Sequence, residues 1–267
     1  MEKLLLGNNI KDKDECGEKG KLCDFYAIVQ KGHEECGDSA FAYTDDKVIF
    51  AVLDGVSGEP GAASASSIAA ITILETLKTK KLTEKAVKEA VIAATRQISH
   101  GLTTLALVFI DKKGSFIMAS VGDSPIYGIS KGKIGMEIPL GRPVNSGDSL
   151  LKFLSFRNLV TSVLGPSGVD IELHMKKGKL KKGEMVILAS DGLSDNLYLI
   201  TTEGYVTDAS GSKDLKELIG ASKDPKAIVK KLMKEVQDRI SKGKIEKNGK
   251  VLVPKVDDIA IIALRWL

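Results

Sequence analysis

The sequence predicts an α+β protein in which layers of β-sheet and α-helix pack together. Short apolar runs rich in β-branched residues follow one another closely, as in residues 48–53 (VIFAVL), and indicate consecutive antiparallel strands. Two helical segments then come in succession, and further hairpins follow them. Successive helices between hairpins argue against βαβ crossovers and for separate layers of sheet and helix.

Composition narrows the class of protein. The 267 residues can bury a sizeable core as one large domain, with two small domains as the alternative. The net charge of +4, with no basic tract and few aromatic residues, does not predict a nucleic-acid binder. No apolar run approaches the roughly 18 residues of a spanning helix, and the first residues do not resemble a signal peptide. We therefore expect a cytoplasmic protein with no membrane partner.

The cysteines indicate reduced thiols. Cys16, Cys23 and Cys36 are odd in number and include no Cys-x-x-Cys pair. Zn²⁺ bound by these cysteines and His33 is an alternative that the ligand types allow, but the spacing matches no familiar zinc pattern.

The first part of the chain predicts a loose lead-in followed by a meander. Residues 1–23 are polar and contain glycine, so we expect a loosely held N-terminal lead-in before a single domain over residues 24–267. Apolar alternation predicts strands at 25–31 and 38–44, and Asp45-Asp46 then turns the chain into the strand that ends before Asp54.

Two helices follow this meander. Small residues in the first half of 61–81 would let that helix approach a sheet closely, and its second half is apolar nearly all round. Thr83 is a plausible N-cap for the second helix, which carries one apolar stripe from Ala86 to Ile98.

The remaining elements alternate hairpins and helices. Residues 101–110 and 115–121 bracket a turn and predict a hairpin. Residues 141–165 have mixed character and fit a flap outside the main sheet. Strands are expected at 170–176 and 185–190, and helices at 213–220 and from Asp224-Pro225, where Asp caps the helix and Pro opens it.

Carboxylates recur where apolar strands begin or end. Asp54, Asp123 and Asp191 each follow such a strand, and Asp257-Asp258 precede another. A single Asp-Gly pair is usually only a turn, but in an antiparallel sheet these ends can lie at one edge. Clustered carboxylates repel one another unless a divalent cation lies between them. Oxygen ligands favour Mg²⁺ or Mn²⁺ over Zn²⁺, and the number of carboxylates suggests two ions.

Five motifs carry a resemblance to a known family. They are LDGVSG (53–58), TTLALV (103–108), VGDS (121–124), LASDGLSD (188–195) and DDIAIIAL (257–264). In this order they resemble the metal-dependent type 2C protein serine/threonine phosphatases, over residues 32–264. The resemblance implies a central sandwich of two antiparallel sheets flanked by pairs of helices, in four layers α-β-β-α. It also implies a two-metal site at one end of the sandwich.

The resemblance assigns a role to each acidic position. Asp54 would bridge both ions, the carbonyl of Gly55 would bind one, and Asp191 and Asp257 would complete the other. Asp123 resembles the position that holds a third, weaker ion in bacterial members. Asp38 matches the acidic residue of the first family motif. Asp258 would support the ligands, although the adjacent pair leaves ligation by either carboxylate open.

The first motif departs from the family at the phosphate-binding position. The family usually has an Arg five residues before the Asp of that motif, and His33 stands there. Lys31 would face the same side of an extended segment, so His33 and Lys31 are the candidate substrate-binding cations. An exposed loop position without a role in binding is the alternative for His33.

We therefore expect hydrolysis of phosphoserine and phosphothreonine in proteins by a water that bridges two Mn²⁺ or Mg²⁺ ions, with Asp54 and Asp191 as catalytic residues. The expected partner is a phosphoprotein substrate, and the expected state is a monomer. One alternative is a non-catalytic pseudophosphatase that binds phosphoproteins. Others are a phosphatase of small phosphorylated metabolites and a structural domain with Asp-Gly turns.

Overall fold

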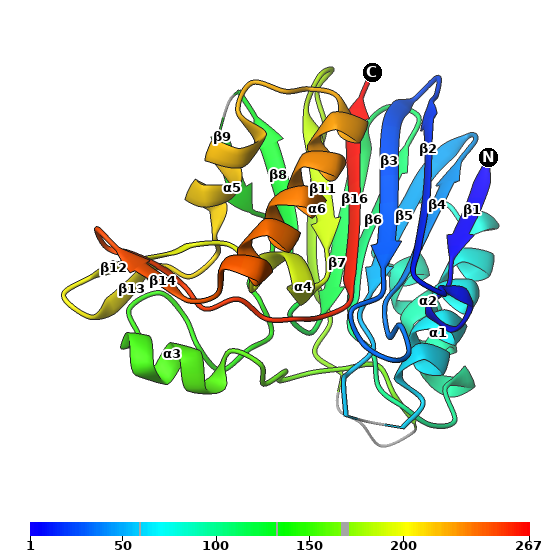
Figure 1. Ribbon diagram of the computed structural model, residues 1–267. Coiled ribbons are helices and arrows are strands. Elements are labelled where there is room, and N and C mark those ends of the chain that lie inside the picture. Colours follow the sequence, from blue (N-terminus) through cyan, green and yellow to red (C-terminus); the bar gives the residue numbers. More distant parts are fainter. Residues whose placement is uncertain (59, 132, 167–170) are drawn as a thin grey trace.

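Two antiparallel six-stranded sheets pack face to face in the computed structural model, which describes residues 1–58, 60–131, 133–166 and 171–267 (Figure 1). The first sheet has the order β1 (Glu2–Leu5), β4 (Ser39–Thr44), β5 (Lys47–Leu53), β6 (Leu105–Asp111), β7 (Ser115–Val121) and β10 (His174–Lys179). The second has the order β2 (Lys13–Lys19), β3 (Cys23–Gln30), β16 (Ile259–Trp266), β11 (Met185–Ala189), β8 (Ile126–Ser130) and β9 (Lys133–Met136).

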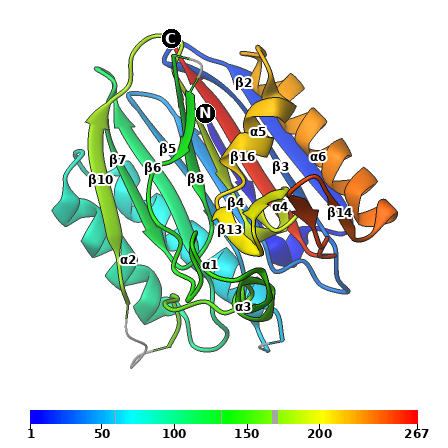
Figure 2. The same ribbon diagram turned by 90° about the vertical axis from the view of Figure 1, so that its left-hand side faces the viewer.

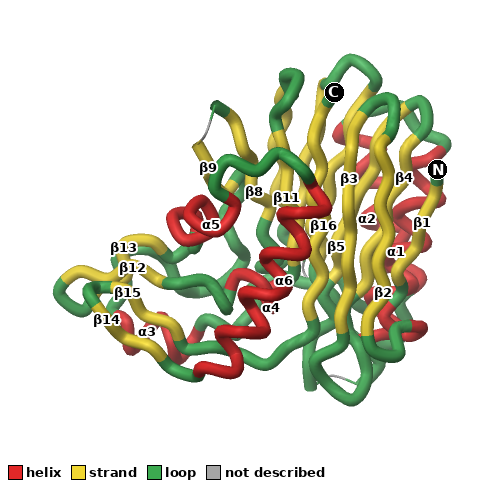
Figure 3. Tube along the Cα trace, turned by 45° about the horizontal axis from the view of Figure 1, so that its top comes forward, coloured by secondary structure: helices red, strands yellow, loops and turns green. Residues whose placement is uncertain are grey.

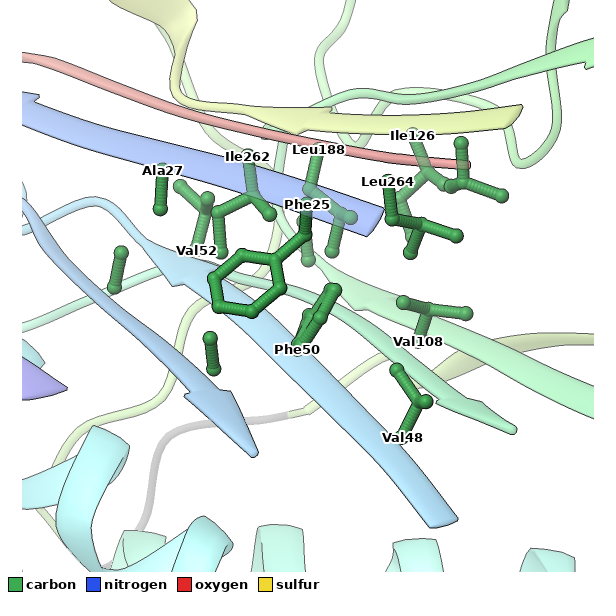
Figure 4. Close-up of a cluster of buried hydrophobic side chains, with 14 of the residues drawn as sticks. Phe25, Ala27, Val48, Phe50, Val52, Val108, Ile126, Leu188, Ile262 and Leu264 are labelled. Atoms are coloured by element: carbon green, nitrogen blue, oxygen red, sulfur yellow. The ribbon is translucent and has the colours of Figure 1, made fainter. Parts of the chain in front are cut away.

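The apolar sequence of strand β5 is unbroken because both faces of the strand are buried. Successive side chains point to opposite faces of a sheet, and both faces of β5 are covered. Val48, Phe50 and Val52 belong to the core between the two sheets, which Figure 4 shows. There the rings of Phe25, from β3, and Phe50 lie 4.8 Å apart. The alternate residues of β5, among them Ile49 and Leu53, pack against helices instead.

Helices cover the outer face of each sheet (Figures 2 and 3). Helices α1 (Ala62–Lys78) and α2 (Glu84–Gln97) pack on the first sheet, and α5 (Ser212–Ile219) and α6 (Pro225–Lys242) pack on the second. The expected caps are present, since Thr83 Oγ1 accepts a hydrogen bond from Ala86 N–H at 3.1 Å and Asp224 caps α6 before Pro225. The predicted α+β fold with four layers α-β-β-α is confirmed.

The N-terminal residues differ from the expected loose lead-in. Strand β1 pairs with β4, strand β2 pairs with β3, and a short 3-10 helix, η1 (Gly7–Asn9), lies between them. Both strands are at the edges of their sheets, and most side chains of β2 are exposed. Edge strands with an exposed face are polar, so their sequence lacks the apolar signal by which interior strands are recognised.

A side lobe extends from the sandwich and is formed by α3 (Leu150–Phe156) and a small sheet of order β13-β12-β15-β14 (Figure 1). These strands are β12 (Leu199–Thr202), β13 (Tyr205–Asp208), β14 (Ile245–Lys247) and β15 (Lys250–Leu252). The lobe has its own apolar cluster, which includes Phe153 and Val206. Helix α3 lies in the segment 141–165 that was expected outside the main sheet.

The strand expected at 170–176 begins at His174, and residue 170 lies outside the described residues. Within the part of the chain that the structure describes, no helix has the length and apolar character needed to cross a bilayer.

Candidate active site

Seven aspartates gather at one end of the sandwich, where β16 begins and the short helix α4 (Asp191–Ser194) lies (lower end in Figure 1). We call this group the acidic cluster; it comprises Asp38, Asp54, Asp123, Asp191, Asp195, Asp257 and Asp258. Antiparallel pairing explains the gathering, because Asp38 precedes β4 and Asp54 follows the neighbouring β5. Asp191 and Asp257 are related in the same way through β11 and β16. Asp191 N–H donates to Asp54 Oδ2 at 3.3 Å and so joins the two sheets.

Asp54 is held by the segment that leads into β6. Its N–H donates to Thr104 Oγ1 at 3.1 Å, and its carbonyl accepts from Thr103 Oγ1 at 3.0 Å and from Thr104 N–H at 2.8 Å. These bonds occupy the backbone of Asp54 and fix the carboxylate at the strand end. The motif TTLALV thus positions Asp54 through its two threonines.

Asp38 lies deeper, at the start of β4. The next residue, Ser39, is fixed by a buried hydroxyl contact of 2.9 Å with Ser66 of α1 and accepts a bond from Gly7 N–H at 2.9 Å. Asp38 is buried, and its Oδ2 has no hydrogen-bond partner among the described residues. Burial, followed by the charge of Asp258, raises the pKa of Asp38 well above its usual range.

The two adjacent aspartates before β16 have different surroundings. Asp258 accepts three backbone N–H bonds from the loop before β4, from Gly32 at 2.6 Å, His33 at 3.2 Å and Gly37 at 2.6 Å. Its carboxylate therefore holds that loop in place. Asp257 instead contacts the His33 ring, with 3.1 Å between Nε2 and Oδ1.

The two candidate phosphate-binding residues are placed differently. The ring of His33 reaches the acidic cluster through Asp257, and 44% of the side chain is exposed. The ammonium of Lys31 donates to the backbone carbonyl of Glu34 at 3.4 Å. The structure therefore brings His33, and not Lys31, into contact with the cluster.

Sequence reasoning missed a buried ion-pair group formed by Arg142 and Asp195. Arg142 is only 3% exposed, donates from Nη1 to Asp195 Oδ1 at 3.0 Å and lies 3.5 Å from Asp123 Oδ2. Asp195 is the second aspartate of the motif LASDGLSD, so its spacing from Asp191 was a usable signal. Arg142 is one of five arginines in a chain rich in lysine, which was a weaker signal.

Lys255 was also missed, and it is the cation nearest the predicted metal ligands. Its Nζ lies 2.6 Å from Asp191 Oδ2, 2.5 Å from Asp257 Oδ2 and 4.0 Å from Asp195 Oδ2. The sequence offered no charged neighbour for Asp191. Tertiary structure supplies one from a residue 64 positions later.

The electrostatics of the cluster are those of a site for cations. Burial, followed by the charges of Asp38 and Asp191, raises the pKa of Asp54 well above its usual range. Burial raises the pKa of Asp123 to about 7, although Arg142 opposes this shift. Such carboxylates gain from an added cation because it relieves both desolvation and mutual repulsion. The unpartnered Asp38 oxygen and the all-oxygen donor set fit a hard divalent ion.

The carboxylates of the acidic cluster do not converge on a single point. Within the described ranges, no three His, Cys, Asp or Glu side chains form a ready-made metal site. This holds for the aspartates of the acidic cluster as it does for the cysteines and His33 of the zinc alternative. Burial also raises the pKa of Cys16 to about 11 and that of Cys23 to about 12, which disfavours the thiolate that a metal would need.

A pocket of about 380 Å³ opens beside the cluster. Its lining includes His33, Gly37, Gly55, Ser57 and Asp258. A side chain at Gly55 would meet the carbonyl oxygens of Ala62 and Gly37 at 2.7 Å, so this position needs glycine. The pocket therefore opens next to Gly55, Asp258 and His33.

Comparison with known proteins identifies a family for the chain. The sequence profile of the family described as "Protein phosphatase 2C" matches residues 30–234, which is more than half of the chain. No curated protein matches the sequence.

Solved structures share the fold at low sequence identity. RsbX in complex with magnesium superposes with a TM-score of 0.65 at 16% identity, over 95% of this chain and all of that one. The serine/threonine phosphatase PstP/Ppp of Mycobacterium tuberculosis gives 0.63 at 15% identity, over 92% of this chain and 99% of its own. The phosphatase MsPP of Mycobacterium smegmatis, in complex with cacodylate, gives 0.62 at 17% identity, over 97% and 99%.

Proposed function

We propose that this chain, which belongs to the protein phosphatase 2C family and is a protein serine/threonine phosphatase, acts with two divalent ions. The ions are Mn²⁺ or Mg²⁺, held by the acidic cluster. The proposed substrates are phosphoserine and phosphothreonine in proteins. The observation that carries the proposal is the gathering of carboxylates, buried except for the half-buried Asp54, at the ends of strands from both sheets.

We assign the ion ligands from position and surroundings. Asp54 lies between the two sheets and is the candidate to bridge both ions, with the carbonyl of Gly55 beside it. Asp191 and Asp257 would hold one ion, and Asp38, with its unpartnered oxygen, would support the other. Asp258 would keep its hydrogen bonds with the backbone amides of the loop before β4.

Asp123 lies outside this two-ion set. A third ion at Asp123 would have to compete with the buried Arg142, which already faces Asp123 and Asp195. Removing a buried cation from two carboxylates costs several kcal/mol, roughly 3–5, in measured cases of broken buried pairs. Because Asp123 Oδ2 has no hydrogen-bond partner among the described residues, we propose that a third ion is held at Asp123, and more weakly than the first two because Arg142 lies beside it.

The chain's own residues would bind and orient the phosphoryl group. The His33 ring, fixed by Asp257, would donate a hydrogen bond to a phosphate oxygen when it is protonated. The small residues of the pocket leave room for the side chain of the phosphorylated residue. Divalent ions bound at the cluster would supply activation of the attacking water and neutralise charge on the phosphoryl oxygens.

The test is hydrolysis of a phosphothreonine peptide with Mn²⁺ and with EDTA. We expect Asp54→Asn and Asp191→Asn each to abolish Mn²⁺-dependent hydrolysis while the protein stays folded, because each carboxylate would ligate an ion. In EDTA, Asp54→Asn should melt at the wild-type temperature or above it, since repulsion within the cluster falls. Sugar phosphates serve as comparison substrates.

Two results would contradict the proposal. Substantial Mn²⁺-dependent activity in Asp54→Asn would remove Asp54 from the ion ligands. Faster hydrolysis of sugar phosphates than of phosphopeptides would move the substrate class from proteins to small metabolites.

A further inference from the structure

Lys255 fills the space between two proposed ion ligands. Its ammonium lies 2.6 Å from Asp191 Oδ2 and 2.5 Å from Asp257 Oδ2, distances at which it hydrogen-bonds to both carboxylates. Those two residues come from the ends of different strands, β11 and β16. A single positive group therefore holds together the same pair that an ion would hold.

An ammonium and a divalent ion cannot both occupy this space. An ion placed between the two carboxylates would compete with the ammonium for Oδ2 of Asp191 and of Asp257, and two cations so close together would repel each other. Binding an ion between Asp191 and Asp257 thus requires the Lys255 side chain to leave. The cost of that departure is subtracted from the affinity for the ion.

The surroundings of Lys255 allow the side chain, but not the backbone, to move. Asn196 fixes the backbone, because its Oδ1 accepts from Lys255 N–H at 3.1 Å and its Nδ2 donates to the Lys255 carbonyl at 2.9 Å. The Lys255 side chain is 24% exposed, in contrast to 3% for Arg142, so part of the side chain borders solvent. Arg142 is enclosed with its carboxylates, whereas Lys255 can turn outward about its own side-chain bonds.

We propose that Lys255 is a tethered counter-ion that occupies the Asp191–Asp257 position in the ion-free protein and is displaced when a divalent ion binds. This rests on the two-ion site proposed above. Lys255 thereby lowers the apparent affinity of that position for metal, and it prevents the two carboxylates from separating when metal is scarce.

Calorimetric titration with Mn²⁺ tests the competition directly. If Lys255 occupies the position about nine-tenths of the time, its removal raises the apparent affinity about tenfold. We expect this increase for one ion in Lys255→Met, which keeps the aliphatic length and removes the charge. Lys250→Met is the matched control, because it removes the same charge from a lysine paired with Glu217, and its Mn²⁺ affinity should equal that of the wild type.

A second measurement needs no variant. Acetylation of wild-type lysines by an amine-reactive ester, mapped by mass spectrometry, should be slow at Lys255 in EDTA, where the ammonium is held by two carboxylates. It should become several-fold faster at Lys255 in Mn²⁺, when the side chain is released. Lys250 provides the internal reference and should react equally under both conditions.

The outcomes separate this proposal from the function on which it rests. Equal Mn²⁺ affinity in wild type and Lys255→Met, or labelling of Lys255 that does not respond to Mn²⁺, overturns the role of Lys255 and leaves the two-ion site standing. Absence of Mn²⁺ binding in the wild type and in Lys255→Met overturns the two-ion site itself.

Discussion

At the candidate active site, the contact that a side chain makes with its neighbour decides where its charged group points. His33 shows this, because its ring is free enough to meet a substrate and yet is oriented by the 3.1 Å contact with Asp257. Lys31, two residues earlier, uses its ammonium on the carbonyl of Glu34. Two cations that the sequence places on one side of a segment therefore have different access to the acidic cluster.

We predict that His33→Ala raises KM for a phosphopeptide more than it lowers kcat. A lost hydrogen bond to a charged group costs about 1.5–3 kcal/mol, which corresponds to an increase in KM of about tenfold or more. His33→Arg should lower KM, because its planar fork can bind two phosphate oxygens. Steady-state kinetics in Mn²⁺ provide the measurement.

Lys31→Ala is the comparison for this prediction and should change KM less than His33→Ala. If His33→Ala and His33→Arg both keep the wild-type KM, His33 has no part in holding phosphate. Lys31 or the ions would then bind it.

At the scale of elements, the N-terminal residues support the site that later strands build. The backbone of η1 packs against the loop before β4, and a side-chain carbon at Gly7 would lie 2.4 Å from the carbonyl oxygen of Cys36 and 2.7 Å from that of Asp38. Gly7 N–H also bonds to Ser39. The segment expected to be a loose lead-in thus packs directly against the backbone of Asp38.

We predict that Gly7→Ala destabilises the protein by about 1–3 kcal/mol, the usual cost of forcing extra atoms into a packed region. The carbonyls it meets belong to backbone and cannot rotate away as a flexible side chain could. Urea unfolding measured in EDTA gives the free energy of unfolding.

Gly135→Ala in β9 is the control, because its added carbon meets no atom within 4 Å and the free energy of unfolding should hardly change. Equal stability of Gly7→Ala and Gly135→Ala would show that η1 does not press on the Asp38 loop.

At the scale of the whole molecule, the sandwich stabilises a cluster of charges that would separate on their own. The core between the sheets fixes the strand ends, so carboxylates from both sheets stay close although they repel one another. Repulsion among these carboxylates lowers the stability of the folded protein when no divalent ion is bound. The size of this effect depends on pH, because only ionised carboxylates repel one another.

We predict that the melting temperature in EDTA falls by several degrees as pH rises from about 4 to about 7. The usual pKa of an aspartate is 3.8, and burial raises the pKa of Asp123 to about 7 in the fold. Between these values the folded protein binds more protons than the unfolded chain, so stability declines with rising pH. Asp38 and Asp54, whose pKa values are also raised, act in the same direction.

Scanning calorimetry across this pH range provides the measurement. Saturating Mn²⁺ should reduce or reverse the decline, because the ions bind the ionised carboxylates of the folded state. A melting temperature in EDTA that rises from pH 4 to pH 7 would show that these carboxylates are stabilised when charged.

The residue patterns by themselves determined the α+β class and most of the acidic cluster, whereas the four-layer arrangement came from the resemblance to a known family. Period-two alternation and unbroken apolar runs such as 48–53 depend on local geometry and on burial of both faces, so they can be read along the chain. Aspartates at strand ends follow from the same geometry, because antiparallel pairing brings the end of one strand beside the start of the next. Asp54, Asp191 and Asp257 were identified in this way.

Only the tertiary structure decided which positive groups face those aspartates. Lys255 meets Asp191 across 64 positions, and Arg142 meets Asp195 across 53, so no spacing rule along the chain relates them. The edge strand β1 was missed for a similar reason, since its partner β4 lies later in the chain, whereas β2 forms a hairpin with the neighbouring β3 and was missed because its exposed face is polar. Long-range pairing leaves no periodic signal in the sequence, because its energy comes from contacts that exist only once the chain has folded.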